Sequence, residues 1–141
     1  MFPVGLPLLL IPFALYNVLV FLTPGFAWDH EIWNVHMMSG SDWSITPAVA
    51  VVAGSVLILL VEMLRAARRG GRRAITDHVL SMILFVAMLV EFMTVRGVAS
   101  ATFFLLLVIS FSDVAGGFAV SVGTARRDIV LDEMGGGGGG V

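Results

Sequence analysis

Asp113 is the residue whose type and position point most directly to chemistry. It lies within an apolar stretch at residues 98–122, long enough to cross a bilayer as a helix. Every arginine of the chain is more than ten positions away. A carboxylate at such a depth is costly unless it is neutralised, paired or hydrated. Asp113 is therefore the leading candidate for a functional side chain.

A second carboxylate and several hydroxyls are expected at a similar level. A helix rises about 1.5 Å per residue, which places Asp113 about 22 Å below residue 98, in the cytoplasmic half of a core of about 30 Å. Glu62 precedes Arg65 by three residues, so it also lies near the cytoplasmic side. The candidate intramembrane polar residues are Asp113, Glu62, Ser81, Ser110 and Ser112.

These residues have a functional and a structural interpretation. In the functional interpretation they form a proton or cation site. Its two carboxylates repel each other when both are ionised, so one of them would hold a proton, as is usual in membrane proton relays. As a structural feature, Glu62 would pair with Arg65 one turn along its helix. Asp113 would then be neutral or hydrogen-bonded between helices. The structural interpretation is preferred.

A further polar group is expected near the other side of the bilayer. Glu91 lies one turn from the end of its apolar stretch, and Arg96 follows across the next turn. Asn17 reaches a similar depth in the first stretch. Asn17, Glu91 and Arg96 are predicted to form a network that holds three helices together, rather than a binding site.

The motifs of common enzyme classes are absent from the sequence. It has no cysteine, which excludes disulfides, thiol nucleophiles and Cys-ligated metals. There is no nucleotide-binding loop and no HExxH motif, and His30 and His36 are not spaced like a helical metal pair. We expect a non-enzymatic protein that uses no cofactor and no metal.

Small residues predict where helices approach closely. On the last apolar stretch, small residues recur at spacings of three and four positions, so they share one face of the predicted helix. A pair of small residues four positions apart occurs on the second stretch. Such faces allow close helix contact in lipid, within one chain or between chains. The predicted packing face consists of Ala50, Gly54, Ser112, Ala115, Gly116 and Ala119.

The apolar residues are gathered in four blocks of bilayer length, at residues 2–22, 47–64, 76–95 and 98–122. Hydrophobic residues make up 58% of the chain and the mean hydropathy is +0.99, against about 45–50% apolar residues in soluble domains. Pro12 predicts a kink in the first block, which is expected to be a retained helix rather than a signal peptide. Thr46 and Thr76 are candidate caps of the second and third blocks. The predicted fold is an all-α, four-helix transmembrane bundle.

Arginine predicts the orientation of this bundle. All eight basic residues are arginines, and seven lie on one side of the predicted membrane, with Arg96 on the other. This asymmetry places both termini in the cytoplasm. The seven are expected to contact anionic lipid headgroups rather than nucleic acid; they are Arg65, Arg68, Arg69, Arg72, Arg73, Arg126 and Arg127.

The segment at residues 23–45 is the predicted extracytoplasmic loop. It contains Trp28, Trp33 and Trp43, and tryptophan is typical of membrane interfaces. Partial alternation on either side of Gly40 favours a short β-hairpin lying on the bundle, while an interfacial helix at residues 27–38 is left open. The chain is divided into a transmembrane domain at residues 1–128 and a flexible tail with a glycine run at residues 129–141.

Several short motifs are spread along the chain. They are Ser39-Gly40 with Trp43, Asp77-His78 with Leu80-Ser81, Glu91-Phe92, Asp113-Val114 with Gly117-Phe118, and Arg126-Arg127-Asp128. In these motifs the chain resembles a group of small four-span bacterial inner-membrane proteins that have no assigned activity. The resemblance covers most of the chain up to residue 128 and implies topology and compartment only.

The sequence therefore predicts an integral protein of the bacterial inner membrane. Four short spans enclose little volume, which favours action through association, as a homo-oligomer or as an accessory subunit of a larger membrane complex. The alternative is a small proton or cation conductor built around Asp113. The expected partners are the lipid bilayer and other membrane protein chains, without nucleic acid.

Overall fold

The elements follow one another as four helices with a hairpin between the first and second. The computed structural model describes residues 6–68 and 72–135, with side chains for 6–68 and 75–135. The elements are α1 (Leu10–Leu22), β1 (Trp33–His36), β2 (Asp42–Ile45), α2 (Pro47–Arg68), α3 (Arg72–Thr94), the 3-10 turn η1 (Arg96–Val98) and α4 (Ala101–Gly135).

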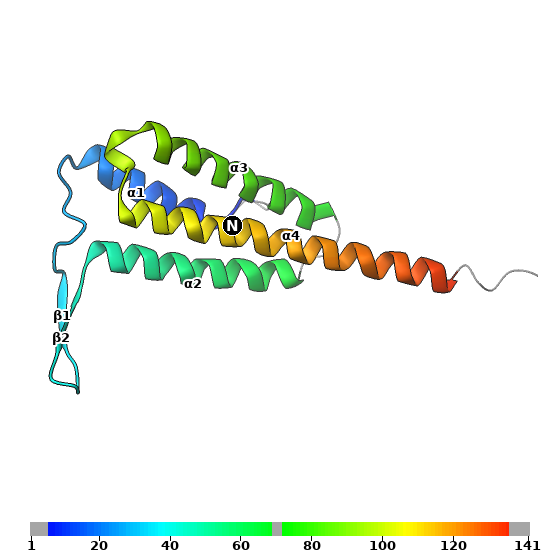
Figure 1. Ribbon diagram of the computed structural model, residues 1–141, viewed down its shortest axis with the longest axis horizontal. Helices are drawn as coiled ribbons and strands as arrows, with labels where there is room; N and C mark the ends of the chain where they lie inside the picture. The colour runs from blue at the N-terminus through cyan, green and yellow to red at the C-terminus, as the bar shows by residue number, and fades with distance from the viewer. Residues whose placement is uncertain (1–5, 69–71, 136–141) are drawn as a thin grey trace, which may run out of the picture.

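Helix α4 is the central element, because each of the other three helices packs against it (Figure 1). Three helices are long and apolar enough to cross a bilayer. They are α2, the part of α3 from Ile75 onward, and α4. Many of their large apolar side chains are exposed around the bundle, as expected for helices that face lipid. The described part of the chain is thus a helical bundle with three helices of membrane-spanning length and composition.

Helix α1 is shorter than the predicted first span. It begins at Leu10 and has 13 residues, or about 20 Å. Pro12 explains the late start, because a proline ring clashes with the carbonyl four residues earlier and prevents a helix from running through Leu8. The predicted kink is wrong, since Pro12 lies in the first turn, where no helical bond is lost. Residues 1–5 of the predicted span lie outside the described residues.

Side-chain caps define the starts of α2 and α4. The Val49 amide donates to Thr46 Oγ1 at 3.3 Å, which confirms the cap predicted for α2. Helix α4 begins at residue 101 rather than 98, and the Phe103 amide donates to Ser100 Oγ at 3.1 Å. Helix α3 begins at residue 72 rather than 76, so Thr76 lies inside it and is not its cap.

Helix α4 also ends later than predicted. It continues to Gly135, whereas residues 129–135 were assigned to a tail. Its 35 residues span about 52 Å, against about 30 Å for a bilayer core. Figure 1 shows its orange end extending beyond the ends of α2 and α3. Residues 136–141, with most of the glycine run, lie outside the described residues.

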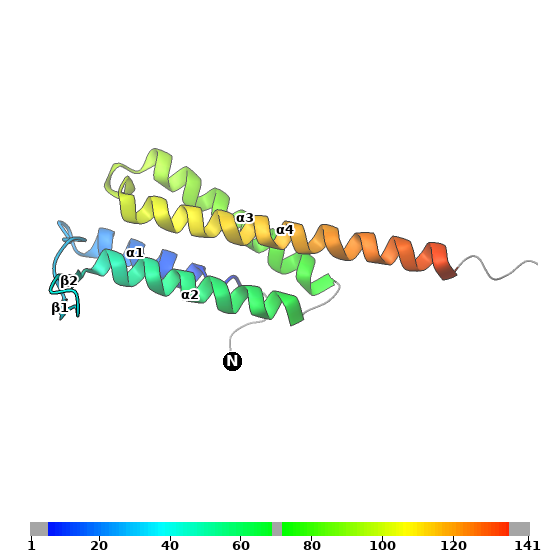
Figure 2. The same ribbon diagram turned by 60° about the horizontal axis from the view of Figure 1, so that its bottom comes forward.

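The outer loop folds as the predicted β-hairpin, and the alternative helix is wrong. Strands β1 and β2 pair antiparallel. Gly40 has a φ of 84°, which favours glycine, and its amide donates to the Met37 carbonyl at 2.9 Å to close the turn. The hairpin does not lie on the bundle as predicted. It projects from one end, across the long axis of the helices (Figures 1 and 2).

The best-packed part of the interior is aromatic and lies at the same end of the bundle. Phe103 of α4 is fully buried and contacts the rings of Phe13, Tyr16 and Phe92. Tyr16 is also fully buried, and the Trp28 ring stacks on it with centroids 4.6 Å apart. These contacts attach α1 and the start of the outer loop to α3 and α4.

Candidate functional site

Polar side chains from three helices meet toward the arginine-bearing end of the bundle. We call Glu62 of α2, Asp77, His78 and Ser81 of α3, and Asp113 of α4 the carboxylate cluster. Asp113 and Asp77 are both electrostatic neighbours of Glu62. His78 is a neighbour of Asp113, and Ser81 hydrogen-bonds to it. The structure thus brings Asp113, Glu62 and Ser81 together at one level, the arrangement that the sequence predicted.

Glu62 binds the beginning of α1. The Leu8 amide donates to Glu62 Oε1 at 3.1 Å, and the Leu9 amide contacts the same carboxyl group. These amides precede the first turn of α1, where a helix leaves N–H groups without internal partners and where its dipole favours an anion. Among the described residues no ion pair joins Glu62 to Arg65, the partner expected on its own helix. Glu62 instead caps a helix more than fifty residues away in sequence.

Asp113 faces the interior of the bundle. Its residue surface is 9% exposed, and Ser81, on the facing side of α3, is 7% exposed. Ser110 is buried one turn earlier on the same face of α4. Ser112 is half-buried, and its hydroxyl donates to the Val108 carbonyl of its own helix at 2.9 Å. Asp113 is therefore hydrogen-bonded between α3 and α4, as the structural interpretation expected.

Two adjacent glycines allow α2 and α3 to approach α4 beside the cluster. A Cβ atom at Gly117 would lie 2.7 Å from His78 Nδ1, so the imidazole rests on the backbone of α4. A Cβ atom at Gly116 would lie 2.7 Å from the terminal methyl group of Met63. Gly116, one of the small residues predicted for helix packing, thus packs within the chain.

The other members of the predicted packing face make no comparable contact. Ala50, Ala115 and Ala119 are exposed. A Cβ atom at Gly54 would meet nothing within 4 Å. The small-residue pattern therefore marks one close contact, at Gly116, and an exposed flank of α2 and α4.

The predicted outer network forms in part. Asn17 Nδ2 lies 3.4 Å from Glu91 Oε2 and also donates to the Phe13 carbonyl at 3.1 Å. Arg96 is exposed and makes no ion pair with Glu91 among the described residues. A neighbouring contact was missed by the sequence analysis, between the Tyr16 hydroxyl and Ser100 Oγ at 2.6 Å. In the sequence, the only indication of this contact was Ser100, a potential helix cap directly before an apolar stretch.

An apolar layer separates the outer network from the carboxylate cluster. On α3, Ser81, Leu84, Met88 and Glu91 follow helical spacing along one face. Leu84 and Met88 are 6% and 2% exposed, and they occupy the two turns between the polar ends. From Ser81 to Glu91 the helix rises about 15 Å. The described residues offer no continuous polar path along this face.

One outer-loop histidine pairs with a carboxylate across the hairpin. His36 Nδ1 pairs with Asp42 Oδ1 at 2.7 Å across the hairpin. Within residues 6–68 and 72–135, no group of three or more potential ligands is placed to hold a metal ion.

The predicted headgroup arginines lie at the end of the bundle opposite the hairpin. Arg65 and Arg68 are exposed in the last turn of α2, and Arg126 and Arg127 are exposed on α4. Arg72 and Arg73 begin α3, and Arg69 lies outside the described residues.

We expect Asp113→Asn to keep the stability of the wild type, because an amide retains the hydrogen bond to Ser81. Asp113→Leu should reduce the free energy of unfolding by about 1–3 kcal/mol, since it leaves the Ser81 hydroxyl unpaired in an apolar interior. Denaturation midpoints in one detergent would measure the difference. Equal losses for the two variants would show that the hydrogen bond between α3 and α4 contributes nothing.

Comparison of the chain with protein-family models, with curated proteins and with solved structures gave no match.

Proposed function

We propose that this protein is a non-enzymatic, multi-pass protein of the bacterial inner membrane that acts through association with other membrane chains, either copies of itself or a larger complex. Membrane insertion is supported by the three long apolar helices. The arginine asymmetry supports cytoplasmic termini and an extracytoplasmic hairpin. The bacterial compartment rests on the resemblance in sequence motifs.

The main observation in support of association is the exposed apolar surface at the C-terminal end of α4. Arg126 and Arg127 mark the expected cytoplasmic boundary, and the helix continues past them for two turns. Val130, Leu131 and Met134 are 54%, 67% and 79% exposed there, and helical spacing places them on one side of α4. Lipid covers apolar side chains within the bilayer, but these residues lie on its aqueous side, where uncovered apolar surface is a mark of a binding interface.

The interior favours association over conduction. The face of α3 between the outer network and the carboxylate cluster is occupied by the buried apolar side chains of Leu84 and Met88, which interrupt a polar path along it. Glu62 and Asp113 both make contacts between helices, with the start of α1 and with Ser81. Wild-type vesicles that dissipate a pH gradient, beside Asp113→Asn vesicles that hold it, would contradict the proposal and support the conductor.

The association is tested by replacing Val130, Leu131 and Met134 together with serine. A buried apolar side chain contributes about 1.5–3 kcal/mol, so the affinity should fall on the order of 100-fold or more. Mass measurement after gentle detergent extraction should show an assembly for the wild type and a monomer for the variant. The bundle itself should keep its denaturation midpoint, because these side chains are mostly exposed on the end of α4 that extends beyond α2 and α3 (Figure 1).

The matched control replaces Asp128, Asp132 and Glu133 with serine. It changes the same two turns of α4 and leaves the apolar side chains in place, so the assembly should persist. A wild-type protein that is extracted as a lone monomer, or an apolar triple variant that keeps its partner, would contradict association through this segment.

A further inference from the structure

The hairpin has one apolar face and one polar face. Its register pairs Trp33 with Ile45 and Val35 with Trp43. Because side chains alternate along a strand, these four residues share one face. The pairs between them, Asn34 with Ser44 and His36 with Asp42, occupy the other face.

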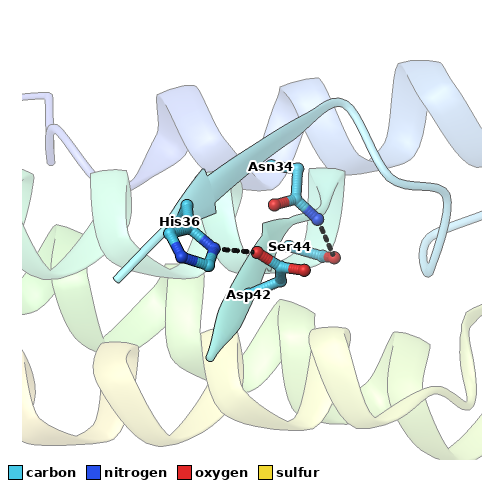
Figure 3. Close-up of polar contacts among 4 residues, drawn as sticks. All are labelled: Asn34, His36, Asp42 and Ser44. Atoms are coloured by element: carbon cyan, nitrogen blue, oxygen red, sulfur yellow. Dashed lines mark hydrogen bonds and ion pairs between the residues drawn. The ribbon is translucent and has the colours of Figure 1, made fainter. Parts of the chain in front are cut away.

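The side chains of the polar face form hydrogen bonds with one another. His36 Nδ1 lies 2.7 Å from Asp42 Oδ1, and Asn34 Nδ2 donates to Ser44 Oγ at 3.4 Å, as Figure 3 shows. The Ser44 hydroxyl donates to Glu31 Oε2 at 2.6 Å. These cross-strand contacts are all solvent-exposed, which suits a face in water.

The apolar face is largely uncovered within the described chain. Trp33 and Trp43 are 68% and 48% exposed, whereas Val35 and Ile45 are half-buried, and the strands project away from the helices (Figures 1 and 2). A lone two-stranded hairpin is marginally stable in water unless an apolar face is packed against something. The two tryptophans of this face therefore need a cover from outside the described residues.

Chain continuity places the hairpin at the expected outer boundary of the bilayer. Only Thr46 separates Ile45 from α2, and the Ala48 amide in the first turn of α2 donates to the Trp28 carbonyl at 3.2 Å. The Trp28 ring is fixed by stacking on Tyr16. Since the hairpin runs across the helix axis, it stays near the level at which α2 begins (Figure 1).

We propose that the hairpin lies in the plane of the membrane beside the bundle, with its apolar face in the outer lipid interface. This inference rests on the proposed membrane location and is independent of association through α4. Tryptophan favours the interface, where its ring meets the acyl region and its N–H reaches water or headgroups. No arginine or lysine lies between residues 6 and 64, so the face suits phospholipid without net charge.

The absence of cysteine from the chain permits a direct test with single spin labels. Val35→Cys places a label on the apolar face, and Asn34→Cys is its matched control on the polar face of the same strand. Phe111→Cys, on the exposed surface of α4, reports on insertion of the bundle. Each labelled protein is reconstituted in phosphatidylcholine vesicles, and its collisions with oxygen and with a water-soluble nickel chelate are measured.

The labels at Val35 and Phe111 should collide mainly with oxygen, which partitions into lipid, and the label at Asn34 mainly with the chelate. Equal chelate access at Val35 and Asn34, with Phe111 still in lipid, would overturn the hairpin proposal alone. A Val35 label shielded from both reagents would show that protein covers this face and would overturn it as well. Chelate access at Phe111 would instead overturn the membrane location.

Discussion

Glu62→Leu should detach the start of α1 from the bundle. The Leu8 amide would lose its acceptor, 3.1 Å away in the wild type, in an interior where nothing on leucine replaces it. The Leu8 amide is half-buried, so leaving it unpaired should cost up to about 1–3 kcal/mol, and the start of α1 would also lose the nearby carboxylate that its dipole favours. The denaturation midpoint should fall, and hydrogen exchange of the α1 amides should accelerate more than that of α3.

Glu62→Gln is the matched control for this prediction. The amide oxygen can still accept from Leu8, and its neutrality removes charge repulsion with Asp113. The loss of the negative charge beside the α1 dipole opposes this gain, so its stability should stay close to that of the wild type. If Gln and Leu destabilise equally, or if exchange accelerates uniformly along the chain, the contact between Glu62 and α1 does not hold the helix in place.

Gly117→Ala should destabilise the protein more than Gly116→Ala. The new Cβ atom at position 117 would lie 2.7 Å from Nδ1 and 3.4 Å from Cε1 of His78, so a rigid ring must move, at a cost of about 1–3 kcal/mol. At position 116 the clash is with the end of the flexible Met63 side chain. That side chain turns aside easily, and alanine is favoured over glycine within a helix by up to about 1 kcal/mol.

A double-mutant cycle tests the cause of this difference. His78→Ala removes the ring, so Gly117→Ala should cost much less in that background than in the wild type. Unfolding in a single detergent gives the four free energies that the cycle needs. Equal costs at positions 116 and 117, or a cost at 117 that persists without His78, would show that the ring does not set the helix separation.

Periodicity and composition were enough to predict the local structure. The apolar blocks predicted four spans, and three of them are helices long and apolar enough to cross a membrane, while the first is shorter. Thr46 before Pro47 predicted a capped start that the bond from Val49 confirms. Alternation around Gly40 predicted the hairpin. These features arise from contacts between residues close in sequence, where the helical and strand repeats constrain the outcome.

Boundaries were predicted less well because they depend on single local interactions. The start of α1 was predicted too early, since the clash of Pro12 with a preceding carbonyl overrode the apolar pattern. The start of α4 was set by the Ser100 cap rather than by the end of the preceding turn. Hydropathy alone reports neither effect, because it is averaged over a window of residues and contains no information about a single hydrogen bond or a single steric clash.

Amino-acid type and depth, read from the sequence alone, identified Asp113 and Glu62 as neighbours at one level. Only the tertiary structure decided their partners. The Leu8 amide that binds Glu62, just before α1, carries no side-chain signal, and the ring of His78 lies on Gly117 because of how α3 crosses α4. Partners distant in sequence depend on the rotation and separation of packed helices, which no local repeat encodes.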